Sequence, residues 1–92
     1  MSQTRFAVGQ DIVLATVEQI KADLRQRIAE TEGDFLIDLE GVEMIDSKGI
    51  GLLISAYSSL STKGRQLSLI NSSEDVRGLL TSLRLNQHFS IS

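Results

Sequence analysis

The run Phe-Leu-Ile-Asp-Leu at residues 35–39 constrains the fold most, because its apolar residues are consecutive rather than alternating. A strand with one buried face alternates apolar and polar residues, whereas a strand inside a parallel sheet is buried on both faces. Asp38 is the one discordant residue in the run. The run therefore predicts a central strand of a parallel sheet that is covered by helices.

Helix and strand patterns alternate along the rest of the chain. Apolar residues at helical spacing predict three long helices, at about 16–30, 47–63 and 72–84. Short apolar runs predict further strands at 66–70 and 88–91, and one or two short strands within 6–14. We therefore predict a single α/β domain over residues 1–92, with a small, mostly parallel or mixed sheet of about four strands and three to four helices.

Local patterns also predict details of the first two helices. Thr16 and Gln19 have the spacing of a capping box, in which each side chain binds the other residue's backbone N–H. In the second helix the expected buried stripe consists of Ile50, Leu53, Ile54, Tyr57 and Leu60. Leu52 projects nearly opposite this stripe at about 100° per residue, so we expect it to be exposed and available to a partner.

The composition excludes several classes of function. The chain has no Cys, one His, and nine basic against twelve acidic residues, for a net charge of −3. Thiolate catalysis and Cys-based zinc sites are therefore excluded, and the scattered basic residues argue against nucleic-acid binding. We find no apolar stretch long enough to cross a bilayer and no signal-peptide pattern, so we expect a cytoplasmic protein without membrane insertion.

The junction between residues 39 and 51 is the most informative segment for function. Open α/β sheets place their sites where strand ends lead into helix N-termini, and Ser47 lies at such a point. Ser47 or Asp46 could simply cap the helix. Gly49 and Gly51 both fall in its first turn, where each costs about 0.8–1 kcal/mol relative to Ala. Close packing explains one glycine more easily than two, so we expect a surface that another protein approaches.

Residues of this segment resemble the central signature of STAS domains, a family that includes the bacterial anti-sigma factor antagonists. The resemblance rests on Ile37-Asp38-Leu39, Val42, and the run Ile-Asp-Ser-Lys-Gly-Ile-Gly at 45–51. It extends to residues 14–20, 67–71 and 76–80, and so covers nearly the whole chain.

The resemblance implies a non-enzymatic phosphorylation switch without a cofactor. In the antagonists, the serine that matches Ser47 is phosphorylated by an anti-sigma factor, a serine kinase with a histidine-kinase-like ATPase fold. The unphosphorylated protein binds that kinase, and a PP2C-type phosphatase removes the phosphate. The partner-binding residues expected here are Glu43, Met44, Asp46, Lys48, Gly49, Gly51, Leu52 and Ser55.

A second class of function stays open at this point. The early region, with Val13 where many antagonists have Asp, is similar to small STAS proteins of chemotaxis systems or lipid-transport complexes. The alternative is therefore a constitutive STAS subunit of such an assembly, not switched by phosphorylation.

Metal-dependent and hydrolytic activity fit the sequence less well. Four carboxylates could offer oxygen ligands to a hard cation, but their spacing does not match an EF-hand loop: Asp38, Glu40, Glu43 and Asp46. Ser47 is outside a Gly-x-Ser-x-Gly motif, and His88 is expected on the surface or an edge strand. We expect neither a metal site nor an enzyme, and we expect Asp38 to bind loop amides.

Overall fold

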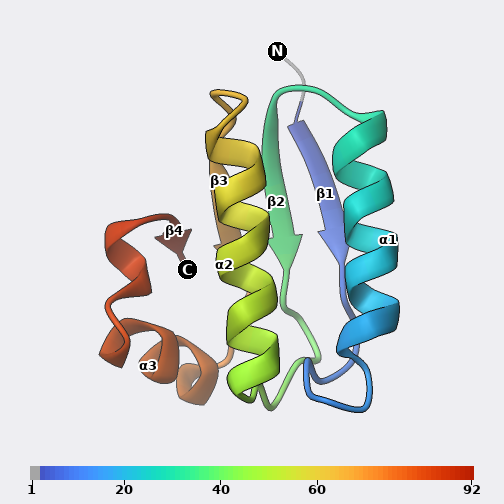
Figure 1. Cartoon of the computed structure of the whole chain (residues 1–92). Coiled ribbons are helices and arrows are strands. Elements are labelled where there is room, and N and C mark those ends of the chain that lie inside the picture. The colour runs from blue at the N-terminus through green and yellow to red at the C-terminus, as the bar shows by residue number, and fades with distance from the viewer. Residues whose placement is uncertain (1–2) are drawn as a thin grey trace.

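The computed structural model describes residues 3–92 and has the predicted α/β architecture (Figure 1). Residues 1–2 of the predicted domain lie outside this range. The elements in chain order are β1 (Gln3–Ala7), α1 (Val17–Glu30), β2 (Asp34–Asp38), α2 (Ser47–Ser61), β3 (Leu67–Ile70), α3 (Glu74–Ser82) and β4 (Ser90–Ile91). A short 3₁₀ helix, η1 (Leu85–Gln87), connects α3 to β4.

The four strands form one parallel sheet in the order β1-β2-β3-β4. The register places Ile37 of β2 between Phe6 of β1 and Leu69 of β3. Phe35, Ile37 and Leu69 are at most 1% exposed. The prediction of a central strand in the 35–39 run is therefore confirmed, but Leu36 is only half-buried, so the predicted full burial of both faces is wrong.

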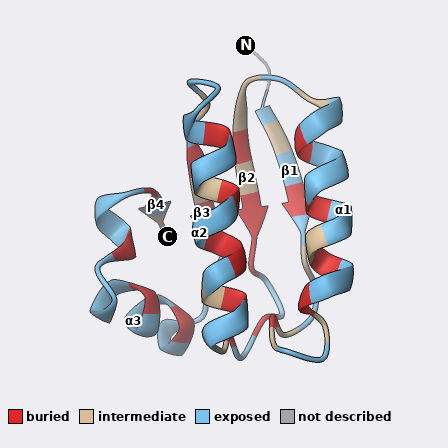
Figure 2. Cartoon of the chain, in the orientation of Figure 1, coloured by how far each residue is buried: buried red, intermediate tan, exposed pale blue. Residues whose placement is uncertain are grey.

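Helices α1 and α2 pack side by side on one face of the sheet, and α3 lies on the side of the molecule that carries the edge strand β4 (Figure 1). Buried residues recur along α1 and α2 between exposed ones, as expected for amphipathic helices (Figure 2). Because all strands are parallel, the loops that follow β1 and β2 meet at one end of the sheet. That end holds Ser47.

The predicted buried stripe of α2 is correct for Leu53 and Leu60 but wrong for Ile54, and the predicted exposure of Leu52 is wrong. Leu52 is only 7% exposed, whereas Ile54 is 46% exposed. Leu52 faces α1, where it shares a narrow space with Leu24 and Ile28. Because α2 packs on both the sheet and α1, its buried residues form a wider band than one stripe: Gly49, Leu52, Leu53, Ala56 and Leu60.

The capping box predicted before α1 is wrong, and the one or two short strands expected within 6–14 are formed only in part. Thr16 precedes the helix, but its hydroxyl makes no cap; it accepts a hydrogen bond from Val13 N and donates one to Asp11 O. The alternating pattern of 6–14 yields β1 at its start. Further on it yields only an isolated bridge between Ile12 and Ile45. The hydroxyl of Thr16 therefore stabilises the loop rather than the helix.

Candidate functional site around Ser47

Asp46 caps helix α2, which leaves Ser47 as the first helical residue. One Asp46 carboxylate oxygen accepts hydrogen bonds from Lys48 N and Gly49 N, both at 3.0 Å. These are two of the backbone N–H groups that a helix start leaves without partners. Of the two capping residues that the sequence allowed, the structure shows Asp46. Ser47 is exposed, and its hydroxyl hydrogen-bonds no group within residues 3–92.

The second carboxylate oxygen of Asp46 connects α2 to the loop before α1. It accepts a hydrogen bond from Leu14 N at 2.9 Å. These backbone donors, Gly49 first and Leu14 next, hold the pKa of Asp46 below its ordinary value. Asp46 is therefore ionised at neutral pH, one residue before Ser47.

Asp11 makes the reciprocal connection between the same two loops. Its carboxylate accepts from Glu43 N at 2.8 Å and from Met44 N at 3.1 Å. Backbone bonds between Ile12 and the 44–46 segment add to it, from Ile12 N to Met44 O and from Asp46 N to Ile12 O. The Ser47 loop is thus held by bonds along its length. Asp11 was not predicted as a site residue, because its partners lie 32 residues or more along the chain.

The two glycines of the first turn have different environments. A Cβ built on Gly49 would overlap the carbonyl oxygen of Ile12 and would lie 2.7 Å from a side-chain carbon of Ile45. A Cβ built on Gly51 would meet no atom within 4 Å. Close packing within the domain therefore explains Gly49, which is buried, but leaves Gly51 unexplained.

The exposed residues around Ser47 form a mixed surface. Met44 is 59% exposed, and Leu14, which sequence analysis missed, is 68% exposed. Glu43 and Lys48 are also exposed. Leu14 follows an apolar alternation that resembled a buried strand, so only the structure identifies it as a surface residue.

A hollow of about 230 Å³ opens between α1 and α2 beside this surface. Four of the predicted partner-binding residues line it: Lys48, Gly51, Leu52 and Ser55. The structure thus brings the predicted site residues together at one end of the molecule. Within that set, Gly49 and Leu52 are largely covered by α1 and the preceding loop, so their predicted exposure is wrong.

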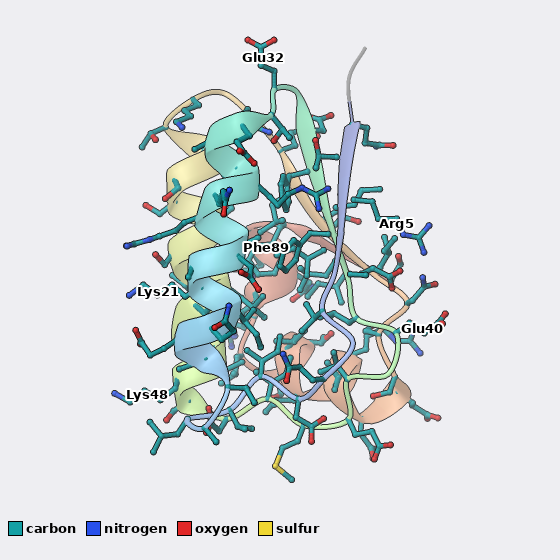
Figure 3. All side chains as sticks on the ribbon, turned by 90° about the vertical axis from the view of Figure 1, so that its right-hand side faces the viewer. Arg5, Lys21, Glu32, Glu40, Lys48 and Phe89 are labelled. Carbon is teal, nitrogen blue, oxygen red and sulfur yellow. The ribbon has the colours of Figure 1, made fainter. Side chains whose placement is uncertain are left out.

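Asp38 belongs to a separate cluster at the end of β2. Its carboxylate accepts from the Arg5 guanidinium, with Nε at 3.0 Å, from Glu40 N at 3.0 Å and from the Asn71 amide at 3.1 Å. These donors, Arg5 first, hold the pKa of Asp38 below its ordinary value. The predicted bond to a loop amide is confirmed, and Arg5 and Asn71 are additional partners. Arg5 and Glu40 point away from the side that carries Lys21 and Lys48 (Figure 3).

Neither a metal cluster nor the histidine accompanies Ser47 in the described part of the chain. Residues 3–92 contain no group of three or more His, Cys, Asp or Glu side chains arranged to hold a metal ion. His88 stacks on Tyr57, with ring centroids 5.5 Å apart. Tyr57 lies ten residues beyond Ser47 on α2, about 15 Å along the helix axis. His88 is therefore not placed to activate the Ser47 hydroxyl.

None of the helices described here has the length and apolar character needed to cross a membrane.

Comparison with known proteins agrees with the fold. The profile of the STAS domain family matches residues 4–92, so the chain belongs to that family. A STAS-domain containing protein of Pseudomonas aeruginosa (strain UCBPP-PA14) is 31% identical over 70 residues, which are 76% of this chain and 69% of that protein.

Two solved structures of anti-sigma factor antagonists share the fold. A putative antagonist from Thermotoga maritima superposes with a TM-score of 0.77 at 20% identity, over 99% of this chain and 74% of the other. SpoIIAA in its unphosphorylated form superposes with a TM-score of 0.72 at 20% identity, over 97% of this chain and 78% of that chain.

Proposed function

We propose that this chain acts as one STAS domain that switches partners, in the manner of an anti-sigma factor antagonist. In this proposal it binds an anti-sigma factor, a serine kinase with a histidine-kinase-like ATPase fold, while Ser47 is unmodified. Phosphorylation of Ser47 by that kinase releases the complex, and a PP2C-type phosphatase restores the bound form. The setting is the bacterial cytoplasm, and the domain itself is a regulator rather than an enzyme.

The exposed, uncommitted hydroxyl of Ser47 is the observation that carries this proposal. Asp46 already caps α2, so Ser47 is available to a kinase without loss of the helix start. The loop before it is held by Asp11 and Ile12, which fixes the backbone from which Ser47 projects. Membership of the STAS family supports the same role.

The occupied N–H groups determine what a phosphate on Ser47 would do. A helix N-terminus ordinarily binds a phosphate through free backbone N–H groups. Here Asp46 occupies Lys48 N and Gly49 N, and its own negative charge lies next to Ser47. A phosphoserine, with a charge of about −1.5 to −2, would therefore stay in solvent. We expect the fold to change little.

The same phosphate would oppose a complex. A partner that covers the Ser47 surface would exclude water from a dianion next to Asp46, whose carboxylate already takes the N–H groups of Lys48 and Gly49. Removing water from an unpaired ion costs several kcal/mol, and each ~1.4 kcal/mol weakens binding about tenfold. The proposed switch therefore blocks an interface and does not refold the domain.

Capture from the cells that encode this chain tests the proposal. The baits are the wild type, Ser47→Ala and Ser47→Asp, with Ser58→Asp as a control that places the same charge on an exposed position further along α2. Wild type, Ser47→Ala and Ser58→Asp should recover the same partner, and Ser47→Asp should lose it. Phosphate should map to Ser47 in protein purified from those cells. Equal recovery by Ser47→Asp would instead favour a constitutive subunit of a chemotaxis or lipid-transport assembly.

A further inference from the structure

The seam between α1 and α2 forms a groove that begins next to Ser47. Three hollows follow one another along it, and each shares lining residues with the next: Lys21 and Ser55 join the first two, and Arg25 and Ser59 join the second to the third. The two outer hollows measure about 230 and 220 Å³, and the middle one, where Leu52 packs against α1, measures about 20 Å³. We call the three together the α1–α2 groove. It extends from Lys48 to Lys63, fifteen residues or about 22 Å of helix.

Basic side chains concentrate in this groove. Lys48, Lys21, Arg25 and Lys63 line it, with Glu18 as the one acidic residue. The rest of the chain keeps five of the nine basic and eleven of the twelve acidic residues. The groove is therefore a positive strip on a protein of net charge −3. Lys21 and Lys48 point to the same side of the molecule, away from the sheet (Figure 3).

No partner within residues 3–92 neutralises the four cations of the groove. The one ion pair of that range joins Arg5 and Asp38, which lie elsewhere. Arg65, by contrast, donates hydrogen bonds to the carbonyl oxygens of Gly33 and Ile28. It therefore joins the segment before β3 to the end of α1 and the loop that follows it. The cations of the groove are thus available to an outside group.

The helix α2 presents small residues along the floor of the groove. Gly51, Ser55 and Ser59 recur every four residues, so they share one face of the helix. Such a face lets another backbone approach closely, as at contacts between helices. Gly51 lowers the stability of α2 and packs against nothing within the domain. A partner whose backbone approaches α2 closely would explain why position 51 has no side chain.

We infer that the α1–α2 groove docks an acidic helix of a partner protein. The groove has the length of about four helical turns, its floor admits a backbone, and its cations complement a row of carboxylates. This inference deepens the proposed function, on which it rests, by naming the chemistry of the partner. It also assigns Lys48 a part in the switch, because a phosphate on Ser47 would place negative charge at the end of the groove that an acidic helix enters.

An amide NMR titration of the full chain with an acidic helix tests this inference. The probe is an alanine–glutamate peptide of about 20 residues, long enough to be helical, and the control peptide replaces glutamate by lysine. The acidic peptide should shift amides along α1 and α2, with an affinity that falls as salt is added. The lysine peptide should not bind.

Three variants separate the groove from general charge attraction. Lys21→Glu should weaken binding of the acidic peptide by about tenfold or more. Arg77→Glu, on the exposed side of α3, is the matched control and should bind as the wild type. Ser55→Phe fills the groove without changing charge and should also weaken binding. The amide spectrum of each variant shows whether it is folded, and Ser59→Phe replaces Ser55→Phe if that variant is not.

Several results would overturn the inference. They are no binding of the acidic peptide, shifts confined to α3, an equal loss in Arg77→Glu, or full binding by both Phe variants. Tighter binding of a single-stranded oligonucleotide or of phosphatidylglycerol vesicles through the same residues would also overturn it. The titration uses unmodified protein and no kinase, so its failure is distinct from that of the capture experiment with Ser47→Asp.

Discussion

Gly49 lies directly against the backbone carbonyl of Ile12, so closely that a side chain on Gly49 would overlap that oxygen. This contact joins the start of α2 to the loop that precedes α1. The nearby Gly51 has open space around its Cα. Position 49 therefore has no room for a side chain, whereas position 51 does, although the two lie in one helical turn.

Alanine substitutions should separate the two glycines. Gly49→Ala forces the Ile12 loop to move, and we expect it to destabilise the domain by about 1–3 kcal/mol. Gly51→Ala removes a poor helix former from an exposed position and should stabilise the domain by about 0.5–1 kcal/mol. Urea unfolding of both variants measures the difference. Equal effects of the same sign would show that the contact between Gly49 and Ile12 is not formed.

Truncation of two α2 side chains tests which face of that helix is buried. Leu52→Ala removes a side chain packed between the helices and should cost about 2–5 kcal/mol. Ile54→Ala removes a half-exposed side chain, and we expect a cost of about 1 kcal/mol or less. Thermal unfolding followed by circular dichroism compares the two. A larger loss in Ile54→Ala would support the orientation that the sequence pattern favoured.

Asp46 and Ser47 should contribute differently to stability. Asp46→Ala removes the cap of α2 and the bond to Leu14 N, whereas Ser47→Ala removes a hydroxyl without a partner in the described chain. We expect a clear loss of stability for Asp46→Ala and a change within about 0.5 kcal/mol for Ser47→Ala. Amide hydrogen exchange at Lys48 and Gly49 reports the cap directly. Faster exchange in Ser47→Ala than in Asp46→Ala would contradict the assignment.

The low pKa of Asp38 predicts how stability depends on pH. Its hydrogen bonds, the one from Arg5 foremost, favour the ionised form in the folded protein. A carboxyl whose pKa is lower folded than unfolded adds stability above its unfolded pKa, about 3.9, and loses that contribution as the pH falls through the folded value.

The urea midpoint should therefore fall on acidification below about pH 4, and Asp38→Asn should weaken this dependence. Glu32→Gln, an exposed loop variant that removes the same charge, is the control and should behave as the wild type. Because the Arg5 side chain is 59% exposed, Arg5→Ala alone should cost about 1 kcal/mol or less. A pH profile in Asp38→Asn that matches the wild type would contradict the contribution assigned to Asp38.

The architecture was predictable because its signals are local. The continuous apolar run of β2 and the helical spacing around it depend on residues close together in sequence, so a parallel sheet followed from them. Burial of Leu52 was not predictable in this way. It depends on where α1 packs against α2, which the spacing of apolar residues within α2 does not reveal.

The location of the candidate site was predictable from the sequence, but the contacts that hold the Ser47 loop in place were not. The position of Ser47 at a strand-to-helix junction followed from element order and from the resemblance to STAS domains. Asp11 has no local signal, because the amides it binds belong to a loop more than 30 residues away. Gly49 and Gly51 look alike in sequence, and only the Ile12 loop distinguishes them.

Partner recovery with genuine phosphoserine at position 47 tests the proposed switch most directly. The unmodified and phosphorylated proteins serve as baits in the same cell extract, and quantitative mass spectrometry compares what each recovers, after amide spectra confirm the same fold. A switch that blocks an interface predicts that at least one protein bound by the unmodified form is depleted about tenfold or more with the phosphorylated form. The same set of proteins in equal amounts on both baits would contradict it.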